Sequence, residues 1–171
     1  GKKYGLEISD EVDMRNSLEA STEAACKFLK ALYRQFGSWT LAAAAYNCGE
    51  NGLQRQINLQ DVRNYYDLRL NSETARYVYR IVAMKLIMQN PQSYGFNLRK
   101  RDMYPQVPYR TVELKGQNVD LYEFAHANQT TYKMLRELNP WLTTDKLANK
   151  ANKTYTVKLP VKNGTLLKTK R

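Results

Sequence analysis

The sequence has very few of the residues on which metal and triad chemistry depend. Its 171 residues include one histidine and two cysteines, which are His126, Cys26 and Cys48. A structural zinc site needs four nitrogen or sulfur ligands, so these side chains cannot supply one. A Ser-His-Asp triad would need His126, and no nucleophile-elbow motif lies near it. We therefore expect no metal and no cofactor, and carboxylates would be the acids and bases of any enzyme here.

Glycine motifs and long apolar runs are also absent. None of the eight glycines belongs to a Walker or dinucleotide-binding pattern. No apolar run approaches the roughly 18–20 residues that a membrane span requires, and the start of the chain has no signal-peptide pattern. The sequence has no initiator methionine. We expect that the chain has been processed or truncated.

Negative charge is scarce relative to positive charge. The chain has 27 Lys and Arg against 16 Asp and Glu, and residues 101–171 carry 13 of these basic side chains but only 6 of the acidic ones. Such an excess indicates a polyanionic partner (nucleic acid, anionic lipid or a cell-wall polymer) or simply a soluble basic surface. Because no RNP, KH or helix-turn-helix signature is present, no nucleic-acid partner is expected.

Hydrophobic residues make up 43% of the chain, and in the first half they follow a helical period. Ser17 is a suitable N-cap for a helix that Gly37 ends. Ser38 can cap a second helix over residues 39–47, whose alanine run predicts close packing on all sides. We expect a third helix from Ser72, acting as its cap, to the stop at Pro91.

The two cysteines lie at similar heights on the first two predicted helices. Each is about 15 Å from the turn at residues 37–38, at about 1.5 Å of rise per residue. Two arrangements are therefore open: neighbouring thiols, or two thiols that are buried separately as small apolar side chains. The sequence does not decide whether Cys26 and Cys48 form a disulfide.

A charged, proline-marked stretch at residues 97–108 predicts a linker, after which the pattern changes. Residues 109–114 alternate like a strand, residues 120–127 predict a short helix, and Thr130 or Thr131 caps a second one. Residues 155–160 predict a closing strand, which gives the order β-α-α-β. We expect residues 163–171 to be a basic tail.

Several ordered motifs in the first half resemble one family. They are residues 12–15 (Val-Asp-Met-Arg), 21–25 (Ser-Thr-Glu-Ala-Ala), 36–39 (Phe-Gly-Ser-Trp), 41–49 (Leu-Ala-Ala-Ala-Ala-Tyr-Asn-Cys-Gly), 68–78 (Leu-Arg-Leu-Asn-Ser-Glu-Thr-Ala-Arg-Tyr-Val) and 88–96 (Met-Gln-Asn-Pro-Gln-Ser-Tyr-Gly-Phe). The run resembles the C-terminal half of the catalytic domain in the membrane-bound lytic murein transglycosylase D family, which has a goose-type-lysozyme-like fold. The resemblance covers residues 1–96.

The second half resembles a LysM module, a β-α-α-β unit that binds N-acetylglucosamine-containing glycans. The matching segments are residues 111–112 (Thr-Val), 132–140 (Tyr-Lys-Met-Leu-Arg-Glu-Leu-Asn-Pro) and 158–160 (Lys-Leu-Pro). The resemblance places glycan contacts around residues 116–120 and 140–143. The expected fold class is therefore mainly α: the C-terminal part of a lysozyme-like domain at 1–96, a linker at 97–108, a LysM-like module at 109–162 and the basic tail.

The resemblance implies cleavage of the MurNAc–GlcNAc bond of peptidoglycan without water, which leaves anhydro-MurNAc ends. One Glu protonates the leaving oxygen and then acts as base toward the C6 hydroxyl of the sugar. In the family this Glu stands in a Glu-Ser segment, upstream of a Gly-Leu-Trp-Gln-Phe-like stretch and a Thr-Gly, none of which occurs here. We expect the catalytic Glu upstream of residue 1.

Four residues of the matching motifs are candidates for substrate binding: Tyr46, Asn47, Glu73 and Tyr77. In the family the Tyr-Asn pair lies at the active site, and the Glu-Thr-x-x-Tyr motif lines the same groove. From the residues alone, Tyr46 and Asn47 could instead be a helix stop signal, and Glu73 a first-turn carboxylate that the helix dipole favours.

Further candidates are weaker. Glu50 is the only other carboxylate near Asn47, and we interpret it as a solvated loop residue. Tyr65, Tyr66 and Tyr79 could extend a glycan groove or could be half-buried packing residues. Cys48 stands where relatives have a small residue such as Ala.

The expected partner is the glycan strand of peptidoglycan, and protein partners are unknown. The resemblance implies a location in the bacterial cell envelope, in the periplasm, with membrane association only through an upstream anchor to the outer membrane. The alternative function is a non-catalytic peptidoglycan-binding or envelope scaffold protein.

Overall fold

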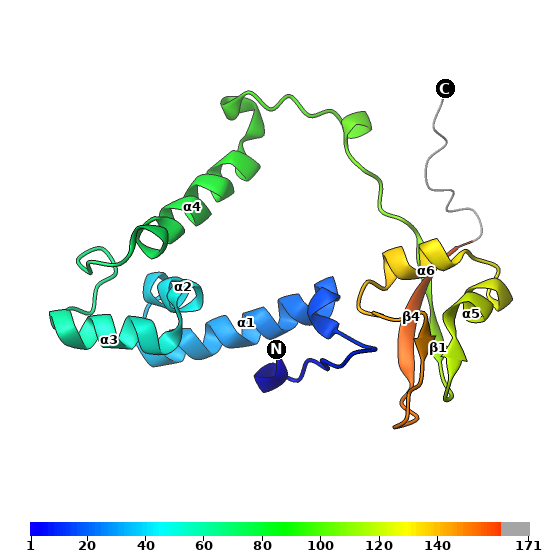
Figure 1. Ribbon diagram of the computed structural model, residues 1–171. Coiled ribbons are helices and arrows are strands. Elements are labelled where there is room, and N and C mark those ends of the chain that lie inside the picture. Colours follow the sequence, from blue (N-terminus) through cyan, green and yellow to red (C-terminus); the bar gives the residue numbers. More distant parts are fainter. Residues whose placement is uncertain (162–171) are drawn as a thin grey trace. The chain divides into compact units, whose positions relative to one another are not determined.

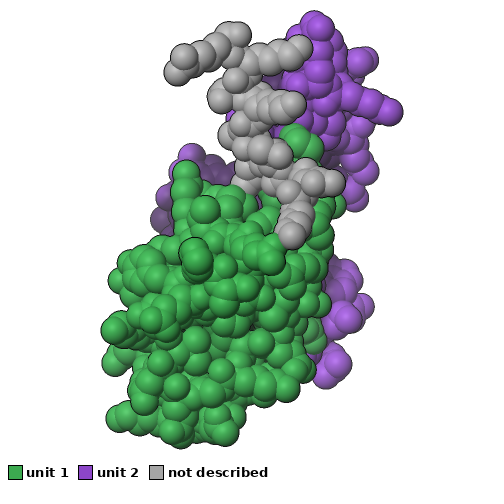
Figure 2. Space-filling view, turned by 90° about the vertical axis from the view of Figure 1, so that its right-hand side faces the viewer, with its two compact units in different colours: residues 1–24, 105–171 green, residues 25–104 purple. Residues whose placement is uncertain are grey.

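The computed structural model describes residues 1–161, which belong to two compact units (Figures 1 and 2). We call residues 25–104 the helical unit, and residues 1–24 with 105–161 the module unit. None of the helices in the described part combines the length and the apolar character needed to cross a membrane.

Within residues 1–161 the structure is mainly α-helical, with a small β component. The α-helices are α1 (Leu18–Phe36), α2 (Trp39–Cys48), α3 (Glu50–Gln60), α4 (Ser72–Gln89), α5 (Leu121–Ala127) and α6 (Tyr132–Leu138). The strands are β1 (Tyr109–Leu114), β2 (Val119–Asp120), β3 (Lys146–Leu147) and β4 (Tyr155–Pro160). Short 3-10 helices are η1 (Lys2–Tyr4), η2 (Met14–Asn16), η3 (Pro91–Tyr94) and η4 (Lys100–Asp102).

The first two helices form where their boundary residues predict. The Ser17 hydroxyl accepts from the Ala20 amide at 3.4 Å, and α1 ends before Gly37, whose φ of 80° suits glycine. The Ser38 hydroxyl accepts from the Leu41 amide at 3.2 Å at the start of α2. The close packing predicted for α2 is confirmed: its buried side chains are Leu41, Ala42, Ala44 and Ala45.

Helix α3 was not predicted, and Glu50, which we interpreted as a loop residue, is its first residue. Only two of its side chains, Leu53 and Ile57, are buried. This pair is four residues apart and is the whole apolar face of a helix rich in Asn and Gln, so the helical period is weak. Gly49 connects α2 to α3 with φ 86° and ψ 142°.

Helix α4 has the predicted length but differs in its cap. The cap is Asn71, whose side chain accepts from the Thr74 amide at 2.9 Å, and Ser72 is already helical. The helix ends at Gln89, ahead of Pro91, as predicted. Of its side chains only Thr74 and Val78 are buried, whereas Ile81, Met84 and Met88 are exposed.

The module unit has the predicted β-α-α-β order. Strands β1 and β4 are antiparallel from Tyr109 opposite Pro160 to Leu114 opposite Tyr155, and the two-residue strands β2 and β3 pair in a separate sheet. Of the two caps proposed for α6, Thr131 is the one that accepts from the Met134 amide. The buried Asn139 side chain donates to the carbonyls of Leu135 and Lys158 and thereby ties α6 to β4.

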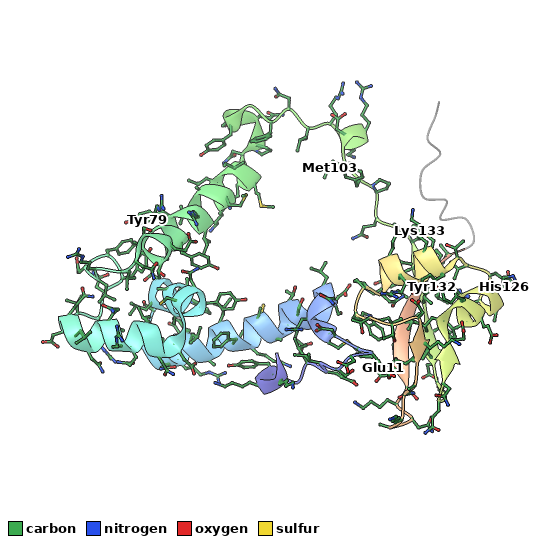
Figure 3. The ribbon with its side chains drawn as sticks, in the orientation of Figure 1. Glu11, Tyr79, Met103, His126, Tyr132 and Lys133 are labelled. Carbon is green, nitrogen blue, oxygen red and sulfur yellow. The ribbon has the colours of Figure 1, made fainter. Side chains whose placement is uncertain are left out.

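The N-terminal segment, residues 7–14, packs against the module. Val12 is 1% exposed and belongs to the module's hydrophobic core, where it pairs with Leu142 in an isolated β-bridge. The Asp13 amide donates to the Trp141 carbonyl at 2.8 Å. The Glu11 carboxylate accepts from two successive backbone amides, Ala148 at 2.9 Å and Asn149 at 3.2 Å. Figure 3 labels Glu11.

The compact units therefore differ from the expected domains. Residues 1–24 pack with the module rather than with residues 25–96, because Val12 and its neighbours find their apolar and hydrogen-bonding partners there. The stretch expected as a linker, residues 97–108, contains η4. The division into domains stays a prediction, and residue 162 and the predicted tail lie outside the described residues.

Both cysteines have free thiols in the structure. Cys26 is exposed and Cys48 is partly buried. The arrangement in which each is a buried apolar side chain is thus wrong for Cys26, which lies on the solvent-facing side of α1. Burial raises the pKa of the Cys48 thiol above its usual value, and a hydrogen bond with Thr74 opposes this shift.

Candidate functional site

Glu73 and Tyr77 lie one helical turn apart in α4 and line one open groove. The groove has a volume of about 620 Å³. Its lining residues are Glu73, Tyr77, Arg80, Ile81, Met84, Lys85, Met88 and Gln89. The structure thus brings together two of the four predicted site residues on one face of α4, which carries both apolar and charged side chains.

The Glu73 carboxylate is engaged by a cation from the same helix. Arg80 Nη1 donates to Glu73 Oε1 at 2.6 Å, and both side chains are about half exposed, at 54% and 56%. Such a pair is worth little for stability because water screens it. It does hold the carboxylate at the end of the groove, where its remaining lone pairs can accept hydrogen bonds from a ligand.

Asn47 is joined to the start of α4 through Thr74. The hydroxyl of Thr74, a residue that is 1% exposed, donates to Asn47 Oδ1 at 2.9 Å. Because this bond occupies the carbonyl oxygen of the Asn47 amide, the amide orientation is set and its NH₂ group remains a donor. Asn47 thus lies against the residue that follows Glu73, which connects the two motifs.

Tyr46 is not part of this arrangement. Its ring is 39% exposed and packs on Phe28, with 5.6 Å between the ring centroids. Tyr46 and Asn47 are consecutive in α2, so their side chains point about 100° apart around the helix axis. Of the four predicted residues, the structure therefore groups Glu73 with Tyr77, links Asn47 to them and leaves Tyr46 aside.

The three weaker tyrosine candidates form one aromatic cluster. The ring centroids of Tyr65 and Tyr66 are 5.2 Å apart, and those of Tyr66 and Tyr79 are 6.2 Å apart. Tyr65 is buried and its hydroxyl donates to the backbone carbonyls of Thr74 and Ala75, so it supports the first turn of α4. Burial also raises its pKa. Tyr66 and Tyr79 are each 59% exposed, and Figure 3 labels Tyr79 on α4.

The two loops expected to contact glycan in the module have different surroundings. The N-terminal segment pairs with residues 140–143, where Thr143 donates its amide to the Glu11 carbonyl at 3.0 Å. Trp141 and Leu142 of that loop are buried. In the other loop, Gly116 has a φ of 96° and Asn118 one of 54°, which makes a tight turn into β2.

Two residues of the site were missed by sequence reasoning. Thr74 entered the sequence interpretation only as part of the Glu-Thr-x-x-Tyr motif. Its position next to Glu73 was a signal that it could belong to the site. Arg80 lies seven residues after Glu73, two helical turns on, and that spacing places it on the same face. No group of three or more His, Cys, Asp or Glu side chains in residues 1–161 could hold a metal ion.

Two family models match this chain. Residues 1–68 match the transglycosylase SLT domain. Residues 110–163 match the soluble lytic transglycosylase C-terminal LysM-like domain. Both models describe domains of lytic transglycosylases, so these two segments of the chain are similar to that family. The mainly α structure with its small β module fits the lysozyme-like fold of such proteins and the attached LysM-like domain.

Curated relatives include membrane-bound lytic murein transglycosylase D of Escherichia coli strain K12. It is 35% identical over 107 residues, which are 60% of this chain and 24% of that protein. The protein of the same name from Escherichia coli O6:H1 has the same identity and coverage. The matched region thus spans about a quarter of the length of these lytic transglycosylases.

Proposed function

We propose that this protein is a peptidoglycan lytic transglycosylase, which cleaves the MurNAc–GlcNAc bond without water and leaves anhydro-MurNAc ends. The observation that carries the proposal is the Asn47–Thr74 hydrogen bond, because it joins the two family motifs of the helical unit beside the Glu73–Tyr77 groove. The SLT match over residues 1–68 and the LysM-like match over 110–163 support the same reading.

The groove residues have separate roles in this proposal. The Asn47 NH₂ group donates to the N-acetyl carbonyl or a hydroxyl of the reacting sugar. Tyr77 offers an aromatic face to a pyranose ring, and Glu73, held by Arg80, accepts from sugar hydroxyls. Tyr46 would contact substrate only at the edge of the groove.

We assign Glu73 to substrate binding and not to proton transfer. A general acid for glycoside cleavage is a carboxyl group kept protonated by an apolar setting. Glu73 is instead about half exposed and bonded to Arg80. The catalytic Glu is proposed to come from the Glu-Ser segment of the family pattern, which this sequence does not contain.

The proposed substrate and partner is the glycan strand of peptidoglycan, in the bacterial cell envelope. A periplasmic location, with an anchor to the outer membrane, extends this proposal by analogy with relatives that are named membrane-bound. The LysM-like module would hold glycan, and the positive net charge of +11 would favour contact with an anionic wall.

A second function is favoured by the Glu73–Arg80 pair. If no carboxyl group of the chain donates a proton, the groove and the module still bind glycan, and the protein acts as a non-catalytic peptidoglycan-binding or scaffold protein. The two functions share a ligand and differ in whether a bond breaks.

Incubation of the full 171-residue chain with purified sacculi tests glycan binding and whether the catalytic acid is a residue of this chain. Mass spectrometry of the supernatant reports released anhydro-muropeptides, and the pellet reports bound protein. Release would show that a carboxylate of this chain, Glu73 or Glu50, is the catalytic acid, and it would contradict the assignment of Glu73 to binding alone. Protein in the pellet without release is the result expected when the catalytic Glu lies in the Glu-Ser segment that this sequence does not contain, and it supports glycan binding. Neither binding nor release would overturn both proposed functions.

The assigned contacts predict graded binding losses. Asn47→Ala removes the donor and should weaken glycan-strand affinity about five- to tenfold, the effect of roughly one lost hydrogen bond of 1 to 1.4 kcal/mol. Tyr46→Phe keeps the ring and should change affinity less than twofold. Fluorescence anisotropy with labelled glycan strands measures both. Equal losses in the two variants would contradict the assignment of Asn47.

A further inference from the structure

A second pocket of the helical unit has an unusual set of polar groups. Its volume is about 910 Å³, and it lies between α3 and the segment that leads into α4. Its walls include two arginines, Arg55 and Arg69, with side-chain amides from Gln56, Gln60, Asn51 and Asn71. None of the described residues that line it has a carboxylate.

Arg69 is held at the pocket by its backbone. The Arg69 amide donates to Gln60 Oε1 at 2.8 Å, and Gln60 Nε2 donates to the Arg69 carbonyl at 3.0 Å. These two bonds clamp the segment onto the last turn of α3 and leave the guanidinium group uninvolved. Arg55 projects from the middle of α3.

Neither guanidinium group is neutralised by a neighbour. Within residues 1–161, neither Arg55 nor Arg69 takes part in an ion pair with an acidic side chain, whereas Arg15, Arg80, Arg99 and Arg136 each do. Two forked donors of equal charge in one carboxylate-free pocket repel each other and are stabilised by an anion between them.

The pocket adjoins the proposed glycan site. Cys48, which lines it, follows Asn47 directly, and Asn71 caps the helix whose Thr74 bonds Asn47. A substituent on a sugar held by Asn47 therefore has a short path into the pocket. In peptidoglycan that substituent is the stem peptide on MurNAc, which carries free carboxylates.

We propose that this pocket binds the stem-peptide carboxylates of peptidoglycan through Arg55 and Arg69. This inference rests on the proposed function, because it takes the glycan strand to lie at Asn47. Guanidinium groups bind carboxylates with two parallel hydrogen bonds, and the amide side chains around them add donors for peptide carbonyls. The pocket thus makes the protein prefer strands that still carry their peptides.

The test compares two soluble ligands of the full chain: labelled glycan strands that bear stem peptides, and the same strands stripped of peptides by an amidase. The original protein should bind the peptide-bearing strands about five- to tenfold more tightly, as expected for exposed charge-assisted bonds. Arg55→Gln with Arg69→Gln should abolish that difference and leave the affinity for stripped strands unchanged. Free stem tetrapeptide should compete, and its fully amidated form should not.

Arg63→Gln is the matched control, since it removes one charge from an exposed arginine of the same unit outside the pocket. It should keep the preference. An equal loss in Arg63→Gln, or inhibition by inorganic phosphate as strong as by the tetrapeptide, would overturn the carboxylate site. Equal binding of both strands overturns this inference alone, whereas binding of neither strand overturns the proposed function as well. Thermal unfolding of each variant confirms that it is folded.

Discussion

At the scale of single residues, one glycine determines how the two central helices meet. Gly49 separates α2 from α3 with φ 86° and ψ 142°, a conformation that residues with a Cβ atom do not adopt without strain. Gly49 follows Asn47 and Cys48 directly. Its conformation therefore sets the direction of α3, which forms one wall of the pocket that contains Arg55 and Arg69. A glycine at this position therefore serves the site as well as the fold.

Gly49→Ala should destabilise the protein by about 1–3 kcal/mol, because the added Cβ meets open space and the whole cost is backbone strain. Gly52→Ala is the control: Gly52 is inside α3, also with open space around it. That change should stabilise the protein by about 0.5–1 kcal/mol through helix propensity. Urea unfolding followed by circular dichroism measures both. Similar values for the two variants would show that the backbone conformation at Gly49 differs in solution.

At the scale of elements, caps define where the helices begin. Asn71, Asp120 and Thr131 each accept a hydrogen bond from an amide in the first turn of the following helix. The sequence alone pointed to Ser72 as the cap of α4, one residue too late. Asn and Ser are nearly equal as caps, so residue type does not decide between Asn71 and Ser72. The backbone conformation of the preceding segment decides which of them is the cap.

Asn71→Ala should cost about 0.5–2 kcal/mol, the usual effect of removing a helix cap. Ser72→Ala should change stability by less than about 0.5 kcal/mol, since Ser72 is an exposed residue within the helix. The free energy of unfolding of each variant, from urea titration, gives the comparison. A larger effect at Ser72 than at Asn71 would identify Ser72 as the cap of α4.

At the scale of the whole molecule, residues at the start of the chain complete the core of the module. Val12 packs in a cluster with Leu114, Leu142 and Leu159, and Glu7 reaches the module through Tyr155 and Lys153. The Glu7 carboxylate accepts from the Tyr155 hydroxyl at 3.0 Å. Residues 7–14 lie within the segment that matches the SLT domain, so the start of that segment contributes to the core of the module.

Val12→Ala should lower the stability of the module unit by about 1–3 kcal/mol, because two buried methyl groups are lost and a cavity remains. Trp141 is buried beside Tyr155 and Trp39 is exposed, so tryptophan fluorescence in a Trp39→Phe background reports this unit alone. Val82→Ala, which removes the same atoms from a half-exposed position, should change stability little. No effect of Val12→Ala on Trp141 unfolding would contradict the contribution of Val12 to the core of the module.

Alkaline pH should weaken the contact between Tyr155 and Glu7. Burial, the hydrogen bond to Glu7 and the charges of Glu7 and Glu11 raise the pKa of Tyr155 to about 12. Because this value lies above the unfolded value of about 10, the stability it contributes is complete below about pH 10 and is lost as the pH rises through 12.

Tyr155→Phe removes this dependence. At neutral pH the variant should be less stable by about 0.5–1.5 kcal/mol, the loss of one hydrogen bond. Above pH 10 the original protein should lose that advantage progressively. Urea unfolding in the Trp39→Phe background at pH 7, 10 and 11.5 follows the difference. A difference that stays constant with pH would show that the hydroxyl does not titrate in contact with Glu7.

Local features of the sequence determined much of the fold. Ser17, Ser38 and Thr131 cap helices through bonds that span three residues, and Gly37 ends α1, so each boundary is encoded within one turn of chain. The alternation in residues 109–114 and 155–160 likewise predicted β1 and β4. Helix α3 was not predicted because only Leu53 and Ile57 follow a helical spacing, and two such positions are too few to establish a helical period.

Contacts between distant residues were decided only by the tertiary structure. The Thr74–Asn47 bond spans 27 positions, and the bonds from Glu11 to Ala148 and Asn149 span more than 130. The same holds for the meeting of Arg55 with Arg69 at one pocket. A capping bond is formed by residues that chain connectivity already holds together, whereas these pairs meet only when the core brings their segments into contact. The sequence therefore determined most of the helices, the two longer strands and the resemblance to one family, and the folded chain decided which polar side chains share a site.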